Sequence, residues 1–171
     1  MKILKFFFAF ALLASFASCS PDDIPTQEEV IGTWEITEVN LQGTATTTDS
    51  QGEVTVADLT GTGFDLDLQI TIEENPNTFS VDGDFSVMVE YSIDGTDFEL
   101  PLEDVEFIEA GTWDITDDII TVVGSNDIET ASISNIDETS LVLDWVYTQT
   151  DTQFGNSIVQ NITGTYTFEK L

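Results

Sequence analysis

Apolar and polar residues alternate along most of the chain after residue 28, which is the pattern of β-strands with one buried and one solvent-exposed face. The pattern is clearest in residues 64–73 and 79–94. A strand as long as residues 79–94 usually bends. Gly83, between Asp82 and Asp84, is the expected position of a bend or bulge. Asn75-Pro76-Asn77 predicts the turn between these two strands.

Weaker patterns predict the remaining strands. Residues 41–52 are rich in Thr, Gly, Gln and Asp and are interpreted as a long loop, and Gly61 and Gly63 are expected to end a short strand. Residues 119–123 are apolar on both faces, which predicts a central strand. No helix is expected after the leader. The other predicted strands are 30–39, 54–59, 98–102 with Pro101 inside it, 105–115, 128–136, 141–148 and 157–171.

A short motif, Gly-Thr-aromatic, occurs three times, at Gly32-Thr33-Trp34, Gly111-Thr112-Trp113 and Gly164-Thr165-Tyr166. Within a strand the Gly and the aromatic residue lie on the same face. Each copy therefore places a residue without a side chain next to a large aromatic side chain, which can pack into the space. The unequal spacing of the copies argues against a solenoid. It favours an all-β fold, an antiparallel meander closed or nearly closed into a barrel of about 8–10 strands whose last strand returns to the first.

The first 27 residues predict secretion and lipid anchoring. Residues 1–18 have a basic start, an apolar run and small residues at the end, as in a secretory signal peptide. The following Cys19 is the only cysteine, and Phe16-Ala17-Ser18-Cys19 resembles the lipobox of bacterial lipoproteins, in which the cysteine is acylated, for example by palmitate. Residues 19–27 would then be a lipidated tether and residues 28–171 the barrel domain. The lipid would be the only attachment to the membrane.

Residues 20–23, Ser-Pro-Asp-Asp, resemble the surface-export signal of Bacteroidetes lipoproteins. The expected location is the bacterial outer membrane, with the domain exposed at the cell surface. An ordinary polar tether, facing the periplasm, is the alternative.

The strand motifs resemble the lipocalin-like domains of Bacteroidetes lipoproteins. The resemblance rests on Ile31-Gly32-Thr33-Trp34 in the first strand and on the closing segment 164–171. In lipocalins the first-strand Gly-x-Trp plugs the closed end of the barrel beneath a basic side chain. The resemblance therefore implies a barrel plug made of Gly32, Trp34 and Lys170, with Lys170 over the Trp ring.

Charge narrows the choice of partners. The chain holds 33 Asp and Glu but only 3 Lys and Arg, for a net charge of −30. Because Lys2 and Lys5 belong to the leader, which has no acid, a chain that starts at Cys19 keeps Lys170 alone and carries −32. Such a surface repels nucleic acid and anionic lipid and attracts divalent cations or basic proteins.

Calcium is the inorganic ion that this acidity favours, because it binds oxygen ligands, although no EF-hand spacing is present. The local acidic clusters that could hold it are Asp82 with Asp84 and Asp114 with Asp117 and Asp118. Diffuse cation condensation on a solubilising surface is the competing interpretation.

Catalysis is not expected. The chain has no His, and its one Cys would be acylated, so the usual nucleophile, base and zinc constellations cannot form. No organic cofactor is implied either.

The apolar stripes on the inner face point to a packed core or to a cavity for one small ligand. The leading hypothesis is a carrier of a small apolar or amphipathic molecule. The alternatives are a non-catalytic surface interaction protein with a solid barrel, which contacts envelope proteins, and an outer-membrane-spanning barrel, which the acids on most strands disfavour. The candidate ligand-binding residues are Phe79, Phe85, Val87, Val89, Tyr91, Leu143, Trp145 and Tyr147.

Overall fold

Nine antiparallel strands form one sheet in the computed structural model of the protein, which describes residues 25–93, 95–105, 108–153 and 155–171. The all-β prediction is confirmed. None of the described helices is long and apolar enough to cross a membrane. The elements are α1 (Gln27–Val30), β1 (Gly32–Thr48), β2 (Val54–Glu73), β3 (Thr78–Ile93), β4 (Thr96–Val105), β5 (Thr112–Thr116), β6 (Ile119–Val123), β7 (Ile128–Ile136), β8 (Ser140–Gln153) and β9 (Asn156–Lys170).

The sheet is a meander in which the last strand returns to the first. The strand order is β4-β3-β2-β1-β9-β8-β7-β6-β5, so β1 pairs with both β2 and β9 near the middle of the sheet. The two edge strands, β4 and β5, are consecutive in the sequence. The edges meet at a bridge in which Phe79 and Gly111 exchange backbone hydrogen bonds of 2.8 and 2.9 Å. Because the edge strands β4 and β5 do not pair with each other and this bridge is isolated, the sheet is curled but not closed.

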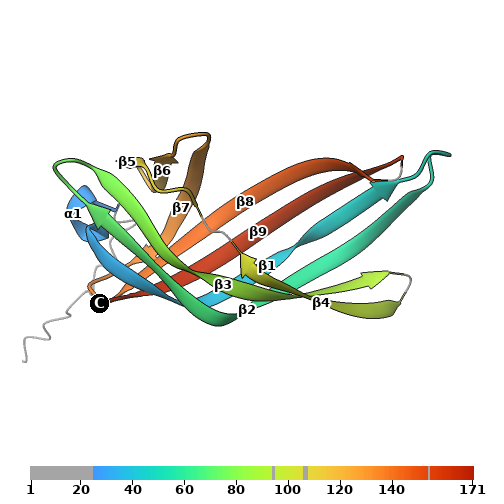
Figure 1. The fold of residues 1–171 in the computed structure, drawn as a ribbon, viewed down its shortest axis with the longest axis horizontal. Helices are drawn as coiled ribbons and strands as arrows, with labels where there is room; N and C mark the ends of the chain where they lie inside the picture. Colours follow the sequence, from blue (N-terminus) through green and yellow to red (C-terminus); the bar gives the residue numbers. More distant parts are fainter. Residues whose placement is uncertain (1–24, 94, 106–107, 154) are drawn as a thin grey trace, which may run out of the picture.

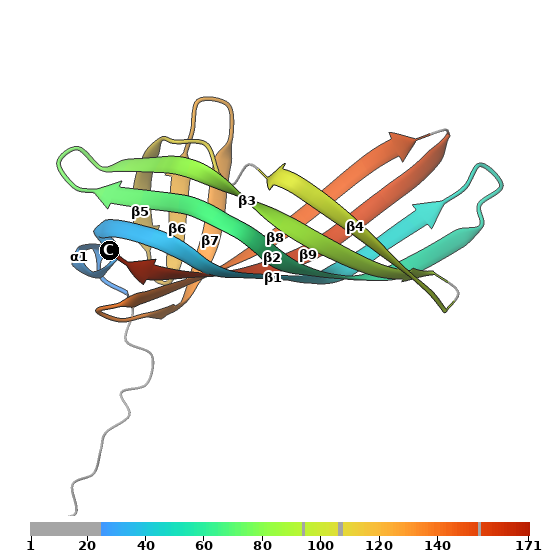
Figure 2. The same cartoon turned by 60° about the horizontal axis from the view of Figure 1, so that its bottom comes forward.

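The curled sheet has a packed half and an open half. β5, β6 and β7 stand at the end of the molecule that also holds α1 and the C-terminus, and β4 lies toward the other end (Figures 1 and 2). At the packed end, inward side chains from the curled strands fill the interior. The fully buried large residues there include Trp34, Ile70, Ile72, Phe79, Leu141 and Phe168.

The open half exists because two strand pairs are incomplete. β4 pairs with β3 only from Phe85 onward, and β7 pairs with β8 only as far as Asp144. Past Asp144, β8 continues with β9 as its one partner among the described strands. The long hairpins β1–β2 and β8–β9 and the hairpin β3–β4 consequently splay at this end (Figure 2).

Several sequence predictions were wrong at the level of single segments. Residues 41–48 are not a loop but the second half of β1, and Gly61 and Gly63 lie inside β2 rather than ending a strand. Threonine is β-branched and fits a half-buried strand, which outweighed the turn composition of residues 41–52. Residues 108–111 are not in a strand, and β6 is next to the edge strand rather than central.

The prediction of no helix was also wrong, because α1 forms one turn that overlaps the end of the expected tether. Thr26 donates from its backbone N–H and its hydroxyl to the Glu29 carboxylate, at 2.7 and 2.8 Å. The bond from the Thr26 N–H to the Glu29 side chain, three residues on, is one half of a capping box and is typical of a helix start. Every described element lies between Gln27 and Lys170, so residues 25–171 contain the whole sheet and its core.

The bulge predicted at Gly83 is not in β3, although Gly83 has an irregular backbone conformation there. Its φ is +83°, and a Cβ there would lie 1.7 Å from the Asp67 carbonyl oxygen. Only glycine fits so close an approach without moving a backbone. The bulge itself lies across the ladder in β2, between Phe64 and Asp67.

Candidate ligand-binding site

The open half of the sheet forms a trough whose inward-facing rows combine glycines with large apolar side chains. Cross-strand partners share a face, so the registers define rows of neighbouring inward side chains. One such row has glycines on either side of a central leucine and larger side chains at both ends. It runs Leu100, Val89, Gly61, Leu41, Gly164 and Trp145, from β4 to β8.

The next row repeats the arrangement one step further from the packed half. Its centre is Gly43, and aromatic side chains form both ends. The glycines make room for their neighbours, because Leu41, Val87 and Tyr166 occupy the space beside Gly61 and Gly164, and the β9 backbone approaches closely at Gly43. The row runs Phe98, Tyr91, Leu59, Gly43, Ile162 and Tyr147.

The trough has a volume of about 760 Å³ and a mostly apolar lining. This volume is in the range of small-molecule sites in proteins. The walls are incompletely covered by protein, since Leu100, Leu102 and Tyr147 are 49%, 42% and 46% exposed. Strands β1, β2, β3, β4, β8 and β9 supply nearly all of the lining, and β7 adds the carboxylate of Glu129.

Two aromatic pairs build the side of the trough and its inner end. Tyr91 and Phe98 stack with ring centroids 5.1 Å apart, which ties β3 to the edge strand β4. Phe85 and Tyr166 meet edge to face at 6.1 Å, where the trough ends against the packed half. Burial raises the pKa of the Tyr166 hydroxyl to about 12, so this group is neutral at physiological pH.

The predicted ligand-binding residues divide between the two halves. Phe85, Val89, Tyr91, Trp145 and Tyr147 line the trough. Phe79, Val87 and Leu143 do not line it and belong to the buried core. The two interpretations of the inner stripe, packed core and cavity, therefore each describe one part of the same sheet.

Sequence reasoning missed most of the floor and one wall of the trough. The floor residues Leu41 and Ala45 fall in the segment that was interpreted as a loop, and the wall residues Leu100 and Leu102 fall in a short predicted strand that was given no role. The inward alternation of residues 41, 43, 45 and 47 was the signal that could have found the floor. It was weak because Gly and Thr occupy two of these positions.

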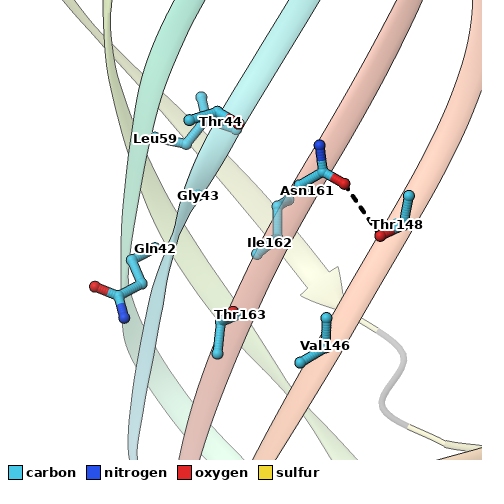
Figure 3. Close-up of a pocket in the computed structure, with 9 residues that line it drawn as sticks. All are labelled: Gln42, Gly43, Thr44, Leu59, Val146, Thr148, Asn161, Ile162 and Thr163. Carbon is cyan, nitrogen blue, oxygen red and sulfur yellow. Dashed lines mark hydrogen bonds between the residues drawn. The ribbon is translucent and has the colours of Figure 1, made fainter.

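A second, smaller hollow of about 430 Å³ lies on the outer face of β1, β9 and β8 (Figure 3). About half of its lining is polar, with Gln42, Thr44 and Thr163 among the side chains, and Thr148 contacts Asn161 through a 3.1 Å hydrogen bond. Polar strand faces of this kind are ordinary solvent-exposed surface. The apolar trough on the opposite face is the stronger candidate site.

The contact that the sequence predicts between Lys170 and Trp34 is present at the packed end. Lys170 Nζ lies 4.8 Å from the centroid of the Trp34 ring, and the two residues are direct partners of β9 and β1. Trp34 is fully buried and donates from Nε1 to the Val30 carbonyl at 2.9 Å. A Cβ at Gly32 would lie 2.7 Å from Lys170 Cε, so the glycine makes room for the lysine.

The Gly-Thr-aromatic copies differ in what their glycine accommodates. A Cβ at Gly164 would lie 2.7 Å from Cε2 of Tyr166, so this glycine gives space to its own aromatic neighbour, as predicted. At Gly111 a Cβ would instead meet the Val123 carbonyl oxygen at 2.1 Å. The Gly111 copy is therefore a place of close backbone approach, where the two sheet edges meet.

The acidic clusters proposed for calcium are not assembled into a metal site. Asp82, Asp84, Asp114, Asp117 and Asp118 are all exposed. Among the described residues, no three acidic side chains lie close enough together to hold a metal ion. The structure gives these clusters no support as ligands.

Among the described residues, three carboxyl groups have a lowered pKa, and each accepts hydrogen bonds at a turn or a helix start. Hydrogen bonds from Asn126 and Ser125 lower the pKa of Glu109, those from Thr139 and Ser140 lower that of Asp137, and those from Thr26 lower that of Glu29. None of the three lines the trough. Their shifts therefore reflect turn and helix-end geometry rather than a catalytic arrangement.

Residues 1–18, Cys19 and residues 20–24 lie outside the described residues, so the structure does not bear on the signal peptide or the lipid anchor. Comparisons with protein-family models, with curated proteins and with solved structures found no match.

Proposed function

We propose that the protein is a carrier that binds a small apolar or amphipathic molecule in the trough. The observation that carries this proposal is the trough itself, with its volume of about 760 Å³ and its walls of leucine and aromatic side chains. In the packed half the inward side chains bury one another, whereas in the open half Leu100 and Tyr147 stay 49% and 46% exposed.

The exposure of the wall residues supports the proposal energetically. Phe98, Leu100, Leu102 and Tyr147 are each between 42% and 49% exposed, and all lie on inward-facing rows. Removing apolar surface from water stabilises a complex by about 25 cal/mol per Å². A bound apolar chain would cover these side chains and gain that stabilisation.

Binding without catalysis is part of the proposal. The ionisable side chains of the trough are Glu129 and the phenols Tyr91, Tyr147 and Tyr166. The sequence has no His. This set supplies one carboxylate and no paired nucleophile and base.

Native mass spectrometry of residues 25–171, exposed to a lipid extract of a bacterial envelope, tests the proposal. A discrete adduct of small-molecule mass is expected. Trp145→Ala removes one wall and should lose the adduct. Val146→Ala changes the adjacent residue, whose side chain is on the outer face and 74% exposed, and should retain it. A bare mass for the unchanged protein, with circular dichroism confirming its fold, would refute the carrier.

An interaction module is the second candidate function. The observation that favours it is the pair of incompletely paired strands at the sides of the trough, β4 and the second half of β8. Such edges can accept an extended strand from another protein. Asp97, Glu99, Glu103 and Asp104 on β4 weigh against it, because charged residues protect edge strands from pairing.

The cellular address is proposed from the N-terminal sequence. We infer that Cys19 is acylated, that this lipid is the sole membrane attachment and that the domain faces the cell surface from the outer membrane. Nucleic acid is not expected as a partner at a net charge of −30. Cys19→Ala should abolish incorporation of labelled palmitate and release the protein from the membrane fraction, while Ser20→Ala should keep the label. Labelling of the Cys19→Ala variant would refute acylation at this residue.

A further inference from the structure

The trough contains no positive charge that could pair with an anionic ligand. Within residues 25–171 the sequence has one Lys and no Arg, and this residue, Lys170, lies over Trp34 at the packed end. Lys170 does not line the trough. A carboxylate, sulfate or phosphate head group would therefore enter without a counter-charge, into a protein that already carries a strong negative charge.

Glu129 places a negative charge in the trough instead. It lies on β7 opposite the buried residue Val122, on the inward-facing side, and is partly buried. β7 begins to pair with β8 only at Ser132, so Glu129 lies where the two strands diverge and the trough begins. The backbone of Glu129 pairs with Val122, whereas its carboxylate has no hydrogen-bond or ion-pair partner among the described residues. A cationic group in the trough would give it one.

Aromatic side chains line the same space. Tyr91, next to Phe98, and Tyr147 lie on opposite sides of one row of the trough, and Trp145 ends the neighbouring row. The faces of Tyr and Trp rings attract cations, most strongly quaternary ammonium groups that carry little bound water. A carboxylate together with several aromatic rings, and no competing cation, is a suitable environment for an alkylammonium head.

We propose that the trough selects an amphiphile with a cationic head group, with Glu129 as the residue that pairs with the head and the apolar rows holding the tail. This inference rests on the proposed carrier function. It adds an order of preference: a cationic amphiphile binds more tightly than an uncharged one of the same chain length, and an anionic one binds least.

Calorimetric titration of residues 25–171 with three ten-carbon probes tests this order. The probes are decyltrimethylammonium and decanoate, each below its micelle concentration, and decanol, below its aqueous solubility, all at low salt. Decyltrimethylammonium should bind at least about tenfold more tightly than decanoate, because both the local carboxylate and the overall field favour the cation. Glu129→Gln should reduce the affinity for decyltrimethylammonium several-fold and leave that for decanol unchanged.

Glu90→Gln is the matched control. Glu90 lies on β3 between the trough residues Val89 and Tyr91, and alternation puts its exposed side chain on the outer face. The variant makes the same change in charge and should leave the affinity of all three probes nearly unchanged.

Other outcomes of the titrations would refute either the charge selectivity, the role of Glu129 or the carrier function itself. Equal affinities, or a preference for decanoate, would overturn the charge selectivity and leave the carrier intact. A preference for the cation that persists in Glu129→Gln but disappears in high salt would remove Glu129 from the site, because it would report only the overall field. No binding of any probe would refute the carrier and the inference with it.

Discussion

Phe79 and Gly111 exchange two backbone hydrogen bonds and so join β3 to the segment just before β5, at the place where the edges of the sheet meet. Phe79 is also 1% exposed, so the bridge anchors a core side chain. This junction separates the packed half of the sheet from the trough, in which β3 pairs with β4 instead.

Gly111→Ala should open the junction. The added Cβ would lie 2.1 Å from the Val123 carbonyl oxygen, so either the bridge or the backbone of β6 must shift. We expect the free energy of unfolding to fall by about 1–3 kcal/mol, as for other overpacked sites, measured by urea denaturation. Thr112→Ala, at the adjacent exposed position, should change it by no more than about 0.5 kcal/mol. Equal losses in the two variants would contradict a special role for the glycine.

The two halves of the sheet should differ in what a large-to-small substitution costs. Phe79 is almost fully buried, and Phe79→Ala should lower the free energy of unfolding by about 3–5 kcal/mol. Tyr147 is 46% exposed in the trough, so Tyr147→Ala should cost less than about 1.5 kcal/mol. Thermal and urea unfolding measure both. A similar loss for Tyr147 and Phe79 would mean that the trough is as well packed as the core.

The sequence predicts the strands of this fold better than it predicts the trough. The alternation of apolar and polar residues correctly predicts strands at residues 64–73 and 79–93, because one face of each strand is strongly apolar. It failed at residues 41–48, where Gly43 and Thr47 face inward and Thr residues face outward, so that both faces look polar. Ala45 and Thr47, two of the small residues that hid this strand from the pattern, line the trough.

The sequence also does not predict where along β8 the packed core ends and the trough begins, and the reason is a different one. Trp145 and Leu143 belong to the same inward stripe of β8, yet Leu143 is buried and Trp145 lines the trough. The difference arises because β7 pairs with β8 opposite Leu143, at Ile133, and leaves it after Asp144. Where a neighbouring strand departs depends on the curl of the whole sheet, which local periodicity does not encode.

Lys170 over Trp34 should contribute modestly to stability. Lys170→Met retains an unbranched apolar stem and removes the charge, and exposed contacts between a cation and an aromatic ring contribute about 0.5–1 kcal/mol. We expect a loss of that size in urea denaturation at high salt, where the general effect of net charge is screened. Lys170→Arg keeps a cation at the ring and should recover most of the loss. A Met variant as stable as the unchanged protein would show that the contact contributes nothing.

Tyr166 should make the stability of the protein fall at high pH. Burial raises the pKa of its hydroxyl to about 12 in the folded chain, whereas an exposed tyrosine in the unfolded chain has a pKa of about 10. Below pH 10 both states keep the proton, and the contribution is fully present. Between about pH 10 and 12 only the folded state keeps it, so the free energy of unfolding decreases with pH, by at most about 1.4 kcal/mol per unit from this group. Urea denaturation across this range should show a shallower decline for Tyr166→Phe than for Tyr147→Phe, the matched change at an exposed tyrosine. Equal slopes in the two variants would contradict the raised pKa of Tyr166.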